Sequence, residues 1–201
     1  MRDEYFSIDR DATATLKVEG SKFIASAFPV GSRQKADEKL KAIRKEHFDA
    51  HHHCFAHVIG SGGEDFRSSD DGEPSGTAGA RILSTIRTKG LSDVLVVVVR
   101  YFGGVKLGVG GLGRAYSDAA TAALSGSTII TKTIEVELHV TFPYSETSGV
   151  MNTLNRLHAR IIDTTYDDDV LLRCAIRKRD TQFLTDELTN VTRGNVGIKH
   201  G

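Results

Sequence analysis

The run Val94–Val99 is the longest uninterrupted aliphatic stretch in this chain of 201 residues, and it constrains the fold more than any other segment. Side chains on a β-strand alternate between the two faces of the sheet, so a run that is apolar at every position is expected to be buried on both faces. We therefore predict that residues 94–102 form a central strand. The run is far shorter than the roughly 20 residues of a membrane-spanning helix, so no membrane span is expected.

The residues before and after this strand show alternating periods of strand and helix. Ser32 is a suitable N-cap for a helix whose apolar positions, Ala36, Leu40 and Ile43, follow helical spacing. The other elements predicted up to residue 131 share this kind of pattern: a hairpin of 12–19 with 22–30, a strand 52–59, a polar loop 60–75, a helix around 78–86 and a helix that follows the glycine-rich segment 103–111.

The pattern restarts near residues 128–133 and then reads strand, helix, strand, strand, helix, strand up to residue 199. This order, βαββαβ, is the signature of a ferredoxin-like domain. We therefore predict an α+β protein of two domains, covering residues 1–131 and 132–201.

Charge is balanced overall but divided along the chain. Lys and Arg number 26, Asp and Glu also number 26, and the formal net charge is zero, which excludes a uniformly basic nucleic-acid binder. Residues 49–75 contain an excess of acids and residues 76–132 an excess of bases, which either neutralise each other in the fold or leave a local basic face.

The two cysteines, Cys54 and Cys174, lie far apart and form neither a CxxC motif nor a disulfide framework. This usage is typical of a reducing compartment, and the first residues contain no apolar signal-peptide core. We expect a cytoplasmic protein.

Four histidines and Cys54 crowd into residues 51–57. On a strand, His51, His53 and His57 would share one face, and His52 and Cys54 the other. Because no paired ligand spacing is present, we predict neither a metal site nor a cofactor. Cys54 is expected to be a small buried residue, although a Cys/His pairing with His52 remains an alternative.

The segment 69–77, called the acidic loop below, contains three carboxylates within four residues: Asp70, Asp71 and Glu73. Turns and an N-cap at Ser75 or Thr77 explain most of its composition, and we expect its carboxylates to meet basic residues of the 100–114 region. The alternative is that they hold a divalent cation or supply a general base.

The sequence of Gly108, Gly110, Gly111 and Gly113 matches GxGxxG, but its distance from the preceding strand departs from the dinucleotide-binding fingerprint. Glycines let a backbone approach a ligand, and a helix N-terminus favours an anion, to which Lys106 and Arg114 would add positive charge. Close packing of the helix on the sheet explains the glycines equally well.

Three long motifs in order carry a family resemblance: HHCFA at 52–56, SDDGEPSGTAG at 69–79 and VVVRYFGGVKLGVGGLGRAY at 97–116. The chain resembles the IMPACT family, in its bacterial YigZ-type branch, over essentially its whole length. Arg81 departs from the proline usual in the family and places a charge beside the acidic loop.

The resemblance implies an N-terminal ribosomal-protein-like α/β two-layer sandwich and a C-terminal ferredoxin-like domain. This pair is similar to domains of translocation elongation factors that contact RNA. Eukaryotic relatives regulate translation through protein partners, and the family carries no established catalytic activity.

The leading hypothesis is a non-enzymatic, translation-associated regulator that binds RNA, the ribosome or a translation factor, without specificity for duplex DNA. Arg100, Lys106 and Arg114 would contact phosphate or an acidic partner, with Tyr101 or Phe102 available for stacking.

The competing hypothesis is a small hydrolase or phosphate-ligand enzyme built on the acidic loop and the glycine-rich segment, with His52 or Cys54 as base or nucleophile. It requires Asp70, Asp71 and His52 to converge in an open cleft. A third hypothesis is a protein-interaction module that uses its C-terminal sheet.

Overall fold

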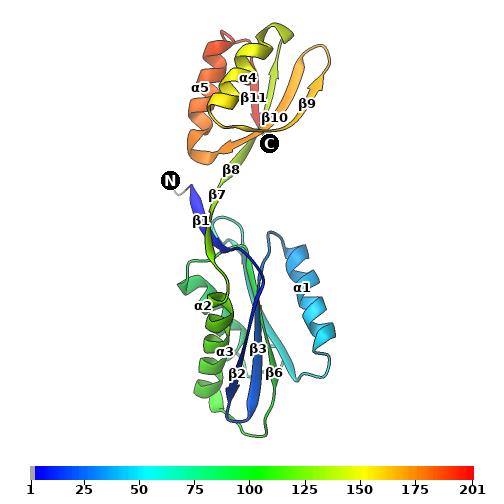
Figure 1. Ribbon diagram of the computed structural model, residues 1–201, viewed down its shortest axis with the longest axis vertical. Helices are drawn as coiled ribbons and strands as arrows, with labels where there is room; N and C mark the ends of the chain where they lie inside the picture. Colours follow the sequence, from blue (N-terminus) through cyan, green and yellow to red (C-terminus); the bar gives the residue numbers. More distant parts are fainter. Residues whose placement is uncertain (1–2) are drawn as a thin grey trace. The chain divides into compact units, whose positions relative to one another are not determined.

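The structure is a computed structural model that describes residues 3–201. The chain divides into two compact units, which are described separately (Figure 1). The N-terminal unit comprises Tyr5–Lys132, and the C-terminal unit comprises Thr133–Gly201 together with residues 3 and 4. Within the described residues, no helix is both long enough and apolar enough to cross a membrane.

The N-terminal unit contains a five-stranded antiparallel sheet in the order β2-β3-β6-β4-β5. Strand β6 (Val94–Tyr101) pairs with β3 on one side and β4 on the other, so the predicted central strand is confirmed. The predicted hairpin is also confirmed. The remaining strands of the sheet are β2 (Ala12–Val18), β3 (Ser21–Pro29), β4 (His52–Ile59) and β5 (Asp65–Ser69).

Helices cover both faces of this sheet. Helix α1 (Arg33–Glu46), capped by the Ser32 hydroxyl as predicted, lies on one face, and α2 (Gly79–Thr88) and α3 (Gly108–Ser125) lie on the other (Figure 1). The mixed α+β class is confirmed, but the unit has a layer of helix on each face where the resemblance implied two layers in all. The sequence of β6 explains the difference. Its side chains are apolar on both faces of the sheet, so each face must be buried by a layer of helix.

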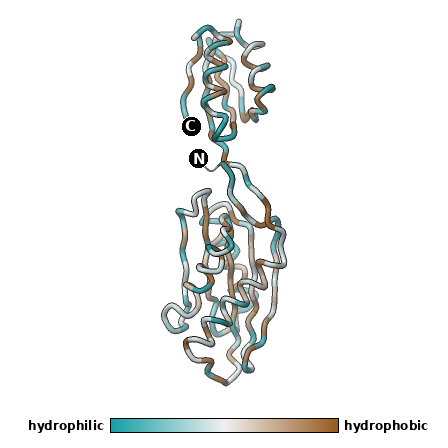
Figure 2. The backbone as a smooth tube through the Cα atoms, turned by 90° about the vertical axis from the view of Figure 1, so that its left-hand side faces the viewer, coloured by the Kyte–Doolittle hydropathy of each residue, from teal (hydrophilic) through white to brown (hydrophobic). Residues whose placement is uncertain are grey.

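Two cores result from the alternation along β6. Val94, Val96 and Val98 face α2 and α3, whereas the residues between them face α1. In Figure 2 the hydrophobic stretches follow the strands inside this unit.

Three strands were not predicted. Strand β5 lies within the predicted polar loop, and Phe66 is its only large apolar side chain, so it lacks the alternation that identifies a half-buried strand. Strands β1 (Glu4–Ile8) and β7 (Ile129–Thr133) form a separate two-stranded sheet. Because this pairing joins residues from opposite ends of the N-terminal unit, no local sequence pattern predicts it.

The C-terminal unit has the predicted ferredoxin-like order, with an antiparallel sheet arranged β11-β8-β10-β9. Its core packs one face of the sheet against both α-helices, through residues such as Leu138, Leu154 and Leu188. The elements are β8 (Glu135–Phe142), the 3-10 turn η1 (Tyr144–Glu146), α4 (Thr147–Arg156), β9 (Arg160–Tyr166), β10 (Val170–Arg177), η2 (Lys178–Asp180), α5 (Thr181–Val191) and β11 (Gly197–His200).

Candidate functional site

Strand β4 presents the histidine and cysteine cluster with the predicted alternation. Cys54 and Ala56 lie in the core beneath α2 and α3, whereas Phe55 lies in the core beneath α1. The side chain of His53 lies on the same face of β4 as Phe55. Its Nε2 is 3.0 Å from the carbonyl oxygen of His47, the C-cap residue of α1. The strand therefore directs His52 and Cys54 toward the side of α2 and α3 and His53 toward the side of α1, where the His53 Nδ1 also lies 3.7 Å from Asp71 Oδ2.

Asp70 caps helix α2 from nine residues away along the chain. Its Oδ1 accepts hydrogen bonds from the backbone N–H groups of Ala78 and Gly79, at 3.0 and 2.8 Å, and its Oδ2 accepts one from Gly76 at 2.9 Å. The predicted cap at Ser75 or Thr77 is wrong, because the N-cap position is Ala78, which has no capping side chain. Burial alone would raise the pKa of Asp70, but the three N–H donors lower it.

Both carboxylate oxygens of Asp71 also accept hydrogen bonds. Its Oδ1 accepts from Arg44 at 2.9 Å, and its Oδ2 accepts from the backbone N–H of His53 at 2.7 Å. The ring nitrogen Nδ1 of His52 lies 2.9 Å from the Asp71 carbonyl oxygen. Asp71 therefore ties the acidic loop to β4 and α1.

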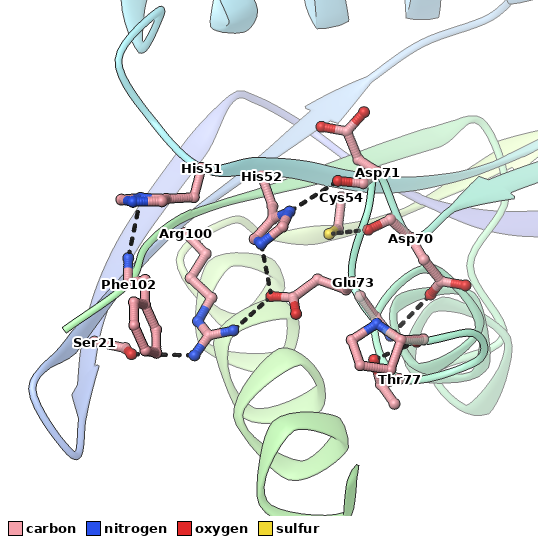
Figure 3. Close-up of polar contacts among 12 residues, drawn as sticks. Ser21, His51, His52, Cys54, Asp70, Asp71, Glu73, Thr77, Arg100 and Phe102 are labelled. Atoms are coloured by element: carbon pink, nitrogen blue, oxygen red, sulfur yellow. Dashed lines mark hydrogen bonds and ion pairs between the residues drawn. The ribbon is translucent and has the colours of Figure 1, made fainter. Parts of the chain in front are cut away.

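Glu73 and Arg100 form a buried ion pair, with 2.7 Å between Arg100 Nη1 and Glu73 Oε1. Their exposed fractions are 8% and 5%. Arg100 Nη2 donates to the Ser21 hydroxyl at 3.2 Å (Figure 3). Tyr116 donates its hydroxyl to the same Glu73 Oε1 at 2.8 Å. The expected contact of the acidic loop with a basic residue is thus confirmed for Arg100, and Arg100 is not the free phosphate contact that the leading hypothesis assumed.

Tyr116 was absent from the predicted site. Its position on the apolar face of α3, one turn after Leu112, could have placed it inside the protein. A buried tyrosine hydroxyl needs a polar partner, so the nearest carboxylate-bearing loop was a reasonable candidate.

The remaining polar groups of this cluster complete a closed network. His52 Nε2 lies 3.9 Å from Glu73 Oε1, and Cys54 Sγ lies 3.0 Å from the Asp70 carbonyl oxygen (Figure 3). Cys54 Sγ also lies 3.3 Å from the Tyr116 hydroxyl. The Asp70, Asp71 and Glu73 carboxylates are therefore held in turns, a helix cap and arginine pairs. This geometry contradicts the open cleft that the hydrolase alternative required. No three His, Cys, Asp or Glu side chains in residues 3–201 are grouped so as to hold a metal ion.

We predict that native Cys54 resists alkylation. Burial raises the pKa of its thiol to about 12, with nearby carboxylates adding to the shift, so very little reactive thiolate exists at pH 8. Iodoacetamide at pH 8 should label Cys54 at least about a hundredfold more slowly in the folded protein than in urea, as followed by mass spectrometry. Comparable rates in the two states would restore Cys54 as a candidate nucleophile.

Tyr101 lies on the face of the sheet opposite to Arg100. Its hydroxyl donates to Asp49 Oδ1 at 3.0 Å and lies 3.1 Å from His47 Nδ1, on the side of α1. Consecutive strand residues point to opposite faces, so Tyr101 and Arg100 could not share one binding surface. Phe102, the next residue, is 40% exposed and remains on the side of Arg100.

A pocket of about 340 Å³ opens where the glycine-rich segment enters α3. Its lining includes Arg100, Lys106 and Gly108, which were predicted site residues. The N-cap of α3 is Leu107, which offers no side-chain acceptor, so the first N–H groups of the helix lack a side-chain cap. The full lining is Glu73, Pro74, Arg100, Phe102, Lys106, Leu107, Gly108, Val109 and Leu112.

Two predicted cations remain exposed: Lys106, just before α3, and Arg114, in the second turn of α3. Lys106 and Arg114 have no carboxylate within ion-pair distance in the part of the chain that the structure describes. The side chain of Arg81, from α2, lies against Gly113 of α3, so the unusual arginine is accommodated by a glycine. We call Lys106, Arg114 and Arg81 the basic rim.

The fold and this site define a two-domain α+β protein with an exposed lysine beside an uncapped helix start. Known proteins share this organisation. Residues 19–124 match the Impact N-terminal domain, and residues 140–195 match a domain of unknown function, DUF1949.

The chain is similar to "IMPACT family member YvyE" of Bacillus subtilis (strain 168), with 32% identity over 100% of this chain and 93% of the relative. It is 33% identical to "IMPACT family member YigZ" of Escherichia coli (strain K12), over 92% of each chain. A solved structure titled "Crystal structure of an hypothetical protein" superposes with a TM-score of 0.79 at 31% identity, covering 98% of this chain and 97% of the other. The chain therefore belongs to the IMPACT family, in its YigZ-type branch.

Proposed function

We propose that this protein is a non-enzymatic, cytoplasmic factor that binds RNA of the translation apparatus through the start of α3. The observation that carries the proposal is the coincidence of an uncapped helix N-terminus with exposed, carboxylate-free Lys106 and Arg114. The partial positive charge of a helix N-terminus and nearby cations together favour phosphate.

The closed state of the acidic loop supports binding without catalysis. Its carboxylates are engaged by the N-terminus of α2, by Arg44 and by Arg100, and none of them pairs with Lys106 or Arg114. The excess of acids in residues 49–75 therefore does not cancel the rim, because Lys106 and Arg114 are left outside these pairs. Phe102, exposed beside the rim, is available for stacking on an unpaired base.

The double variant Lys106→Ala/Arg114→Ala should bind single-stranded and ribosomal RNA at least about tenfold more weakly near 100 mM salt. Each lost phosphate contact lowers the magnitude of the slope of log K against log salt by about 0.7, so the slope should fall by roughly 1.4. Fluorescence anisotropy with labelled RNA across a salt series measures both quantities.

The matched control is Lys41→Ala/Lys45→Ala, which removes the same charge from exposed positions of α1, on the other face of the sheet. Equal weakening by the two variants would show that net charge alone governs binding and would contradict the proposed interface. Affinity purification from cells with and without RNase tests the translation role, since ribosomal particles should be recovered only without RNase.

A further inference from the structure

The sheet of the C-terminal unit has two unlike faces. One face packs core residues such as Leu138 and Leu172 against α4 and α5, which lie together on that side (Figure 1). The residues that alternate with these along β8 and β10, such as His139 and Leu171, are exposed on the other side. Antiparallel sheets often leave one face in water, so exposure alone predicts no partner. The order of the side chains across this exposed face, called the open face below, is more informative.

Titratable side chains form one row across the open face. The register of the four strands places Lys199 of β11, His139 of β8, Arg173 of β10 and Asp163 of β9 side by side. Neighbouring strands lie about 4.8 Å apart, so the first and last positions of the row are separated by about 14 Å. The row therefore ends in a cation at one edge of the sheet and in an anion at the other.

The charge of the inner arginine is neutralised within the chain, whereas the two edge charges are not. Arg173 Nη2 lies 2.7 Å from Glu137 Oε1, on the neighbouring strand β8. Lys199 and Asp163 are exposed, and neither has an oppositely charged side chain within ion-pair distance among residues 3–201. Asp163 accepts only the backbone N–H of Thr164, at 2.9 Å. Opposite unpaired charges thus remain at the two ends of one row.

The adjacent row divides by size in the same direction. It consists of Gly197 of β11, Thr141 of β8, Leu171 of β10 and Thr165 of β9. Leu171 is 47% exposed, whereas Gly197 has no side chain, so the row is low at the β11 edge and projects at β10. A hollow of about 360 Å³ lies on this face and is lined by residues of all four strands. A projecting apolar group therefore stands beside a low half of the same face.

A two-fold axis parallel to the strands matches both rows when two open faces meet. Rotation about this axis reverses each row, so that β11 of one copy faces β9 of the other and β8 faces β10. Lys199 then faces Asp163 of the second copy at both edges, and Leu171 faces Thr141 of the second copy, beside the low edge at Gly197. An axis across the strands would instead place each strand against its own copy and the two Lys199 side chains on one edge, where they repel. Charge and size thus select the same axis.

We propose that the open face joins two copies of this chain about a two-fold axis parallel to its strands. At the usual strand spacings, such a contact covers about 500 Å² of each copy. The total of about 1,000 Å² is near the lower limit for a specific interface, so the dimer is reversible and dissociates on dilution. The inference goes beyond the proposed RNA binding, because neither the basic rim nor the acidic loop takes part in this contact.

Sedimentation analysis of the full chain measures the association, after nuclease treatment so that RNA cannot bridge two copies. Between about 1 and 500 µM, the average mass should rise from that of one chain toward that of two, as a small reversible interface requires. The mass of one chain over this whole range would overturn the proposal, whatever other partner the open face binds.

Reversal of a single edge charge tests the two-fold arrangement. Lys199→Glu brings two carboxylates together at both edges and Asp163→Lys brings two ammonium groups together, so each variant alone should dimerise at least about tenfold more weakly. In an equal mixture, each variant supplies the charge that the other requires at both edges. Mixed dimers should then form as tightly as dimers of the unchanged protein. Weakening by both variants without recovery on mixing would contradict this arrangement.

The apolar part of the contact is tested by Leu171→Ser. Dimerisation should weaken at least about tenfold, because the lost apolar contact occurs twice in each dimer. The matched control is Phe183→Ser, which changes a 52% exposed side chain of α5, on the helix side of the same unit, and should leave dimerisation unchanged. Equal effects of the two variants would show that the open face is not the interface. Lys106→Ala/Arg114→Ala should dimerise as the unchanged protein does, so RNA binding and dimerisation can fail independently.

Discussion

Arg100→Ala is expected to lower the free energy of unfolding of the N-terminal unit by about 3–5 kcal/mol, because it leaves the Glu73 carboxylate buried without its cation. The side chain of Glu73 is 3% exposed, so its carboxylate depends on protein partners more than on water. Tyr116 still donates one hydrogen bond to the carboxylate, but a hydroxyl does not neutralise a charge. The remaining nearby group, His52, lies 3.9 Å away.

Urea denaturation followed by circular dichroism measures this loss. Arg114→Ala removes the same charge from an exposed position of the same unit and should change stability by less than about 0.5 kcal/mol. The double variant Arg100→Leu/Glu73→Leu should recover part of the loss, since replacing a buried pair with apolar residues removes the unpaired charge. If Arg100→Ala were as mild as Arg114→Ala, the guanidinium would have to be solvent-accessible, as a phosphate contact requires.

The sequence predicts most of the fold because the decisive patterns are local. The aliphatic run 94–99 predicts the central strand. The order of strand-like and helix-like hydrophobic patterns after residue 133 predicts the ferredoxin-like sheet. The edge strand β5 and the β1–β7 pair escape this reasoning. An edge strand needs few apolar residues, and a pairing between distant segments leaves no periodic trace in either one.

The sequence predicts a set of candidate site residues but not how they are arranged. Strand alternation from the buried Val98 already directs Arg100 into the core beneath α3 and Tyr101 to the other face. The same rule places the two residues on different surfaces. It also leaves Lys106 and Arg114, which lie outside the strand, as the exposed cations.

The partner of each acidic residue follows no such rule. Asp70 and the helix it caps are separated by a turn whose path depends on Gly72 and Gly76, both with positive φ. An N-cap residue ordinarily stands one position before its helix, so proximity alone favours Ser75 and Thr77. Only the folded turn brings Asp70 to the start of α2.

Asp70→Ala is the second substitution with a large expected effect, a loss of about 2–4 kcal/mol in the free energy of unfolding. It removes the acceptor of three backbone N–H groups, and each such bond to a charged acceptor contributes about 1.5–3 kcal/mol, not fully additively. Ser75→Ala, at the exposed position that the sequence favoured as the cap, should cost less than about 0.5 kcal/mol. A large loss from Ser75→Ala and a small one from Asp70→Ala would reverse the assignment of the cap.

Acid provides an independent measure of the same interaction. The pKa of Asp70 is lowered in the folded protein, so its contribution to stability is present above its unfolded pKa, about 3.9, and is lost as the pH falls through the lower folded pKa. The stability difference between the unchanged protein and Asp70→Asn should therefore be constant near pH 7 and should shrink as the pH falls below about 4. Other carboxylates with lowered pKa, such as Asp93, titrate equally in both proteins and cancel in this difference. A difference that stays constant down to pH 2 would mean that the Asp70 charge is not what holds the N–H groups of α2.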